Sequence, residues 1–167
     1  MRIGILTVSD RSARGERPDL SGPAIEELIS ERGWSVNRVE IIPDELPLLI
    51  DTLATWADSG EFDIILTTGG TGFSPRDITP EATIKVVHRE APGLAEAMRA
   101  ASLNLTPYAM MSRARAGIRG RTLIVNLPGS PRAAVENLNV VLPVFEHAVA
   151  LLSDDPGAEA GHRQASE

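Results

Sequence analysis

The sequence FDIILTTGGTGFSPRD, residues 62–77, joins an apolar run to a glycine-rich polar loop. The run Phe62–Leu66 is typical of a buried strand, and the loop after it contains three glycines, three threonines, a serine, an arginine and an acid. Glycines let backbone N–H groups face a bound group, and the carboxyl end of a parallel strand is a natural site for a phosphate-bearing ligand. A tight strand-to-helix turn explains the same loop equally well, so the loop alone leaves both interpretations open.

The rest of the chain alternates between strand and helix patterns. We predict strands at Arg2–Val8, Trp34–Ile42, Asp63–Thr67 and Arg121–Leu127. We predict helices at Ser21–Arg32 with Ser21 as N-cap, at Asp44–Ser59, from Thr79 to about His88, at Pro92–Leu105, and at Ser130–Leu152 with a break or kink at Pro143. The basic segment Tyr108–Gly120 is expected to be irregular. This alternation predicts a single α/β domain whose mainly parallel sheet carries helices on both faces.

The composition narrows the class of protein and of ligand. A chain of 167 residues, 43% of them hydrophobic, suits one domain, which we place at residues 1–152, followed by a disordered acidic tail at residues 153–167. The net charge of −7 and the aromatic content of 4% argue against a nucleic-acid partner. The chain has no cysteine, and its three histidines are far apart, so the sequence argues against a zinc site.

The start of the chain and its hydropathy indicate no membrane partner. The chain begins directly with a strand-like run, Ile3–Val8, without the basic and apolar regions of a signal peptide. No apolar segment is expected to approach membrane-spanning length. We therefore expect a cytoplasmic protein.

Polar segments follow each of the predicted parallel strands. They are Ser9–Ser12, Pro43–Glu45, the glycine-rich loop ending in Arg76 and Asp77, and Leu127–Pro131. In an open α/β sheet these segments share one edge, where ligands bind. All four carry groups suited to an anionic ligand or to its metal ion. This convergence is stronger evidence for a site than any one of the motifs.

Each of these residues also has a simpler explanation. Asp44 is favoured as a mere helix N-cap, and Ser130 is equally well an ordinary N-cap or part of an anion site. Asp10 and Arg11 could pair with each other at the surface. Asp77 is harder to explain, because an acid at the end of a phosphate-type loop repels phosphate unless a divalent metal lies between them. The loop matches neither the P-loop nor the dinucleotide motif.

Several motifs in order identify a resemblance that covers residues 2–152. They are VSDR (8–11), DLSGP (19–23), TTGGTG (67–72), PRDITPEAT (75–83), PGL (92–94), RAGIRG (115–120) and LPGSP (127–131). The chain resembles the molybdopterin-binding, molybdopterin adenylyltransferase family of molybdenum cofactor biosynthesis, and also the G domains of gephyrin and of its plant counterpart. The resemblance implies a three-layer α/β/α fold, a homotrimer, and possible hand-over of the product to a molybdenum-insertion protein.

The resemblance also implies an activity and a site. The activity is Mg²⁺-dependent transfer of AMP from ATP to the terminal phosphate of molybdopterin; a non-catalytic molybdopterin-binding carrier of the sister branch is the alternative. Asp44 and Asp77 match the essential acids, and we expect them to hold Mg²⁺. The expected substrate and nucleotide residues are Ser9, Asp10, Arg11, Thr68, Gly69, Gly70, Thr71, Gly72, Ser74, Pro75, Arg76, Gly129 and Ser130. Arg17 departs from the family, which commonly has an aromatic residue there.

Overall fold

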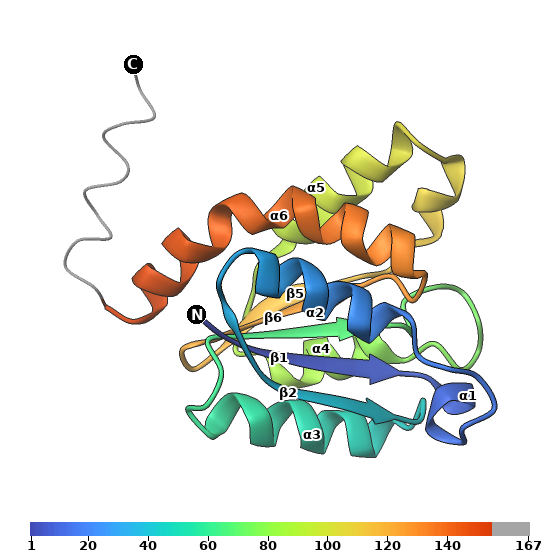
Figure 1. The fold of residues 1–167 in the computed structure, drawn as a ribbon, viewed down its shortest axis with the longest axis horizontal. Helices are drawn as coiled ribbons and strands as arrows, with labels where there is room; N and C mark the ends of the chain where they lie inside the picture. The colour runs from blue at the N-terminus through green and yellow to red at the C-terminus, as the bar shows by residue number, and fades with distance from the viewer. Residues whose placement is uncertain (155–167) are drawn as a thin grey trace.

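Strands and helices alternate through most of the computed structural model, which describes residues 1–154 (Figure 1). The strands are β1 (Arg2–Val8), β2 (Ser35–Ile42), β3 (Ile64–Thr68), β4 (Arg89–Glu90), β5 (Ala116–Arg119) and β6 (Thr122–Leu127). The helices are α1 (Asp10–Ala13), α2 (Ser21–Glu31), α3 (Leu46–Asp58), α4 (Thr79–Val86), α5 (Pro92–Leu103), the 3-10 helix η1 (Pro107–Met111) and α6 (Pro131–Leu152). The predicted tail begins at Ser153 and Asp154, and the remainder of it, 155–167, lies outside the described residues.

One mixed sheet of order β2-β1-β3-β6-β5-β4 forms the middle layer. The strands β2, β1, β3 and β6 run parallel, whereas β5 and β4 are antiparallel to their neighbours. The carboxyl ends of the parallel strands therefore meet at one edge, which is the right-hand edge in Figure 1. The predicted three-layer α/β fold with a mainly parallel sheet is confirmed.

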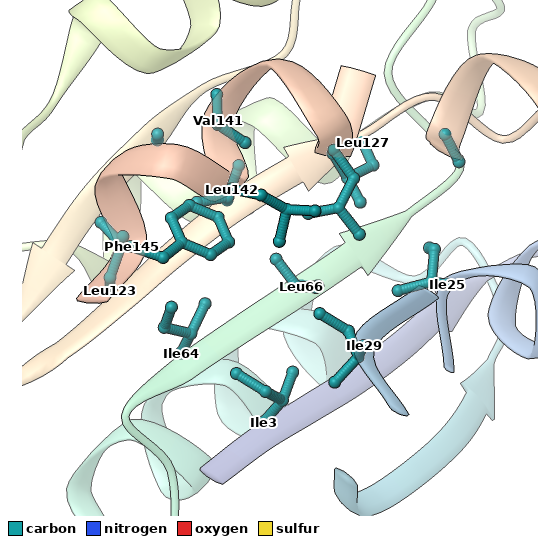
Figure 2. Close-up of a cluster of buried hydrophobic side chains, with 14 of the residues drawn as sticks. Ile3, Ile25, Ile29, Ile64, Leu66, Leu123, Leu127, Val141, Leu142 and Phe145 are labelled. Carbon is teal, nitrogen blue, oxygen red and sulfur yellow. The ribbon is translucent and has the colours of Figure 1, made fainter. Parts of the chain in front are cut away.

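Buried aliphatic side chains cover both faces of the sheet. Successive strand residues point to opposite faces, so Ile64 packs under α2, α5 and α6 while its neighbour Ile65 packs against α3 and α4. Figure 2 shows the first cluster, in which Phe145 of α6 lies next to Ile64 of β3 and Ile29 of α2 lies next to Ile3 of β1. Because each central strand is buried on both faces, its sequence is a nearly continuous apolar run.

The antiparallel part of the sheet was not predicted. The segment Tyr108–Gly120, expected to be irregular, contains η1 and β5, and β5 pairs with both β4 and β6. The sequence of β5, Ala-Gly-Ile-Arg, has no apolar run and no alternation, and β4 has only two residues, so neither strand has a recognisable pattern. The short α1 was also missed, and the other boundaries shift by a few residues.

The helix α6 corrects two expectations. It continues through Pro143 as a single helix. Its 22 residues are long and apolar enough to cross a membrane by length and composition, contrary to the expectation that no segment approaches that length. The buried side chains of α6, such as Leu138 and Phe145, pack in the core over the sheet. The core helix of a globular protein can also be long and apolar enough to meet this length and composition criterion.

Candidate functional site

A polar cavity of about 400 Å³ opens at the carboxyl edge of the sheet. Residues from five separate segments line it, which agrees with the expectation that the strand ends converge there. The lining residues are Thr7, Val8, Ser9, Ser12, Arg17, Pro18, Asp19, Leu20, Ser21, Asp44, Thr68, Gly69, Gly70, Asp77, Gly129 and Ser130. We call this the polar cavity.

The glycine-rich loop approaches the end of β1 so closely that only glycine fits. A Cβ atom at Gly69 would lie 2.3 Å from the carbonyl oxygen of Val8, and the φ angle of Gly69 is +98°. At Gly70, where φ is +62°, a Cβ atom would lie 2.4 Å from the hydroxyl of Thr79 and 3.1 Å from a carboxylate oxygen of Asp44. The backbone itself therefore forms the floor of the polar cavity beside Asp44.

Asp44 is not the N-cap of its helix. That position belongs to Glu45, while the Asp44 carboxylate accepts a 2.8 Å hydrogen bond from the backbone N–H of Asp10. Burial raises the pKa of the Asp44 carboxyl, and the negative charges of Asp10 and Asp77 raise it further, against the opposing effect of the Asp10 N–H and Arg76. This carboxylate therefore lies in a region with an excess of negative charge.

Asp10 pairs across the cavity rim with Arg76, and not with Arg11. Two hydrogen bonds of 2.9 Å join the guanidinium of Arg76 to both carboxylate oxygens. The guanidinium holds the pKa of Asp10 below its usual value. This ion pair connects the glycine-rich loop to the segment after β1, and it leaves the charge of Asp77 uncompensated by Arg76.

The acids of the polar cavity fit a metal ion only if a ligand completes the coordination. Within residues 1–154 no group of three potential metal-ligating side chains is close enough to hold an ion. Mg²⁺ commonly binds through one or two carboxylates together with phosphates of the substrate. Asp44 and Asp77 both line the polar cavity, and they would serve as these two carboxylates.

Two helix starts border the polar cavity. The helix α2 is capped by Asp19, whose carboxylate accepts from the N–H groups of Ser21 and Gly22, so the expectation that Ser21 is the N-cap is wrong. The helix α6 follows Ser130, which makes no side-chain capping bond. The first N–H groups of α6 are therefore available to an anion.

A second, mainly apolar cavity of about 260 Å³ adjoins the other side of the glycine-rich loop. Thr71 and Gly72 form part of its wall, together with the residues of α5, η1 and α6 that face it. Its polar groups include Ser102, Asn137 and Glu136. We call this the apolar cavity.

The structure brings most of the predicted site residues together. Those that line the polar cavity are Ser9, Asp44, Thr68, Gly69, Gly70, Asp77, Gly129 and Ser130. Thr71 and Gly72 line the apolar cavity, and Asp10 and Arg76 form the ion pair at the rim. The remaining three, Arg11, Ser74 and Pro75, line neither of these two cavities.

Several residues at the site were not predicted from the sequence. Asp19 and Arg17 line the polar cavity, and Tyr108 and Met111 line the apolar one. The motif DLSGP was recognised, but nothing in its pattern shows that Asp19 faces β1 and accepts a 2.6 Å hydrogen bond from Thr7. The residues of η1 lie in the segment that was expected to be irregular, so they had no predicted position.

The fold and the site define an α/β domain with a polar, glycine-floored cavity at the carboxyl edge of its sheet and an apolar cavity beside it. The family model described as "Probable molybdopterin binding domain" matches residues 4–147. The chain therefore belongs to the molybdopterin-binding domain family of molybdenum cofactor biosynthesis, as its motifs predicted.

Individual proteins of known name agree with this assignment. The chain is 44% identical to a molybdopterin adenylyltransferase of Helicobacter pylori, covering 91% of this chain and 88% of that protein. It is 43% identical to gephyrin of Dictyostelium discoideum, covering 92% of this chain but only 23% of gephyrin. The solved structure of the molybdopterin biosynthesis enzyme MoaB from Thermus thermophilus has a TM-score of 0.87 and 53% identity, with 93% and 98% of the two chains covered.

Proposed function

We propose that this protein transfers AMP from ATP to the terminal phosphate of molybdopterin, releasing pyrophosphate, in molybdenum cofactor biosynthesis. The observation that carries the proposal is the joint position of Asp44 and Asp77 in the polar cavity, next to the glycine-rich loop. The 44% identity with a molybdopterin adenylyltransferase across nearly the whole chain supports the same activity.

The proposed reaction needs alignment and charge neutralisation more than a strong base. An oxygen of the molybdopterin phosphate forms a bond to the α-phosphorus of ATP, and the bond from that phosphorus to the oxygen bridging to the β-phosphate breaks. Pyrophosphate leaves with the electron pair of the broken bond. The attacking phosphate monoester is already largely dianionic near neutral pH, since its second pKa is about 6.

The residues of the polar cavity then have distinct tasks. Asp44 and Asp77 would hold Mg²⁺ together with oxygens of the triphosphate. Bound there, Mg²⁺ neutralises charge on the anions that must approach each other. The N–H groups of the glycine-rich loop and of the start of α6 would bind phosphate oxygens. Positioning of this kind can supply a large part of the rate enhancement.

The apolar cavity suits the pterin part of the substrate. A flat heteroaromatic ring system favours a mainly apolar pocket with a few polar groups at its edges. Tyr108 and Met111 provide apolar surface, while Asn137 and Glu136 provide hydrogen-bonding groups. Because Thr71 and Gly72 separate the two cavities, a molybdopterin in the apolar cavity could extend its phosphate toward the nucleotide.

A second candidate function is molybdopterin binding without AMP transfer. The observation that favours it is that the Thermus thermophilus protein MoaB, whose name states no AMP transfer, is 53% identical, above the 44% found for the adenylyltransferase. Both candidates use the apolar cavity, and only AMP transfer needs the two acids of the polar cavity. The difference is therefore testable at Asp77.

The deciding experiment measures pyrophosphate release from Mg·ATP, with and without molybdopterin, for the wild type and for Asp77→Asn. Removing the charge of Asp77 while keeping its shape should lower turnover by roughly 100-fold or more. The matched control is Asp51→Asn, the same chemical change at an exposed position of α3, which should leave turnover unchanged.

The outcomes separate the two candidates. Release that depends on molybdopterin and is lost in Asp77→Asn supports AMP transfer. A wild type that binds molybdopterin and releases no pyrophosphate supports the binding function. Turnover of Asp77→Asn equal to that of the wild type contradicts the role given to Asp77.

A further inference from the structure

Four consecutive carbonyl groups of the glycine-rich loop, those of Gly69 to Gly72, accept hydrogen bonds from other segments. Thr79 donates its hydroxyl to the carbonyl of Gly69 at 2.9 Å and its N–H to the carbonyl of Gly70 at 3.0 Å. Arg113 donates its N–H to the carbonyl of Thr71 at 2.9 Å and its Nε–H to the carbonyl of Gly72 at 2.6 Å. Four consecutive peptide groups are thus held by two residues.

These bonds fix where the N–H groups of the loop point. In a trans peptide the carbonyl of one residue and the N–H of the next point in opposite directions, and no peptide bond in the described residues is cis. The N–H groups of residues 70–73 therefore point away from Thr79 and Arg113. None of these four N–H groups has an acceptor among residues 1–154.

Arg113 also reaches the acid at the end of the loop. Its guanidinium donates to the carbonyl of Asp77 at 2.8 Å, and the Asp77 carboxylate in turn accepts from the N–H of Ser74 at 2.9 Å. A single side chain therefore contacts both ends of the stretch from Gly72 to Asp77. Lysine could not replace it, since an ammonium group lacks the planar arrangement of donors that reaches separate acceptors.

The guanidinium itself is anchored by α4. Glu81, in the first turn of that helix, forms an ion pair with Arg113. The other carboxylate oxygen of Glu81 is buried without a hydrogen-bond partner among the described residues. The charge-assisted contact with Glu81 helps to hold the guanidinium of Arg113 next to the carbonyl groups of Gly72 and Asp77.

We propose that Arg113 is a positioning residue that holds the N–H groups of Gly72 and Phe73, and the Asp77 carboxylate, in the orientation that binds the phosphates of the nucleotide. Thr79 holds the N–H groups of Gly70 and Thr71 in the same way. This inference rests on the proposed function for its role in catalysis, while the anion-binding orientation of the loop is testable without any turnover.

The first test records backbone amide resonances by NMR while inorganic pyrophosphate is added. In the wild type the amides of residues 70–73 should shift. In Arg113→Lys the shift of Phe73 should be lost, because its peptide group is held by the Arg113 side chain, while those of Gly70, Thr71 and Gly72 remain. Thr79→Val, which removes the bond to the Gly69 carbonyl, should instead abolish the shift of Gly70. The matched control is Arg115→Lys, since that side chain pairs with Glu90 and does not contact the loop.

The second test measures pyrophosphate release. Arg113→Lys should lower turnover by roughly 10- to 100-fold, whereas Arg115→Lys should stay within about twofold of the wild type. Added guanidinium should restore part of the turnover of Arg113→Ala, which a merely structural defect would not allow. Should Arg113→Lys fail to fold, Glu81→Gln weakens the same anchor and should give smaller changes in the same amides.

The results of the two tests distinguish the positioning role of Arg113 from the proposed AMP transfer. A wild type without AMP transfer whose loop amides shift as described rejects the proposed function and supports the positioning role. An unchanged shift of Phe73 in folded Arg113→Lys overturns the inference, as does a wild type whose four loop amides do not respond to pyrophosphate.

Discussion

The charge of Asp44 has opposite effects on stability and on the proposed activity. Burial is the main reason why the pKa of Asp44 in the folded protein lies above its unfolded value near 3.8. Between these two pKa values the folded state therefore binds more protons than the unfolded state. Stability is therefore lost as the pH rises through that window, and the loss is complete once the pH exceeds the folded value. A bound cation would remove this cost.

Asp44→Asn should therefore stabilise the unliganded protein at neutral pH while abolishing AMP transfer. We expect a melting temperature higher by about 1–3 °C at pH 7, and a difference that disappears as the pH falls below 3.8. Thermal unfolding followed from pH 3 to pH 8 measures it. The control is Asp51→Asn, and a melting temperature of Asp44→Asn below that of the wild type at pH 7 contradicts the prediction.

Arg17, at a position where the family commonly has an aromatic residue, lines the polar cavity. Of the described residues that line the polar cavity, only Arg17 is basic, and it makes no hydrogen bond or ion pair with another described residue. The glycine-rich loop contains no lysine. A guanidinium here can therefore contribute positive charge to the binding of phosphates.

Arg17→Ala should weaken Mg·ATP binding by about 5- to 20-fold, more at low than at high salt, with turnover at saturation nearly unchanged. Calorimetric titration with ATP, AMP and adenosine shows which part of the nucleotide is contacted, since a phosphate contact predicts the largest loss for ATP. Arg14→Ala is the control in the same loop, because Arg14 already pairs with Glu16. Equal losses for ATP and adenosine would mean that Arg17 contacts the base instead.

At the scale of elements, the site depends on the close approach of two connecting segments. The glycine-rich loop follows β3, and Gly69 lies against the last residue of β1 and near Gly129 after β6. Gly69 can lie this close to the Val8 backbone only because it lacks a Cβ atom. The glycines at this edge are therefore needed for packing as well as for binding.

Gly69→Ala should destabilise the protein strongly, by about 2 kcal/mol or more, because its φ angle is +98° and the added atom would meet the Val8 backbone. Gly93→Ala is the control, since no atom lies within 4 Å of its added Cβ in α5. That change should be neutral or stabilising by up to about 1 kcal/mol. Urea unfolding of both variants measures the difference, and equal stabilities would contradict this account of the contact.

Some helices and strands of this fold can be predicted from the sequence, and others cannot. The parallel part of the sheet can be predicted from the apolar runs of β1, β3 and β6 and from the turn and capping residues before each helix. The convergence of Ser9, Asp44 and Asp77 follows from that prediction. The strand β5 could not be predicted, because its pairing is set by neighbours far along the chain. The role of Arg113 was hidden for the same reason, since its acceptors lie 36 to 41 residues away.

At the scale of the whole molecule, the resemblance to the family implies a homotrimer. Exposed apolar side chains gather near the end of α5 and in η1, where Leu105, Tyr108 and Met110 are each more than 60% exposed. Light scattering after gel filtration should give three times the chain mass of 17.9 kDa. A stable monomer at micromolar concentration would contradict this expectation.

The two ends of the described chain lie opposite the site. The N-terminus and the end of α6 are both at the amino-terminal edge of the sheet (Figure 1), where Asp154 pairs with Arg121 beside β6. Both ends of the described residues therefore lie on the far side from the two cavities. This arrangement makes the domain a unit that can be fused into longer proteins without obstructing its own ligands, which agrees with its match to less than a quarter of Dictyostelium gephyrin.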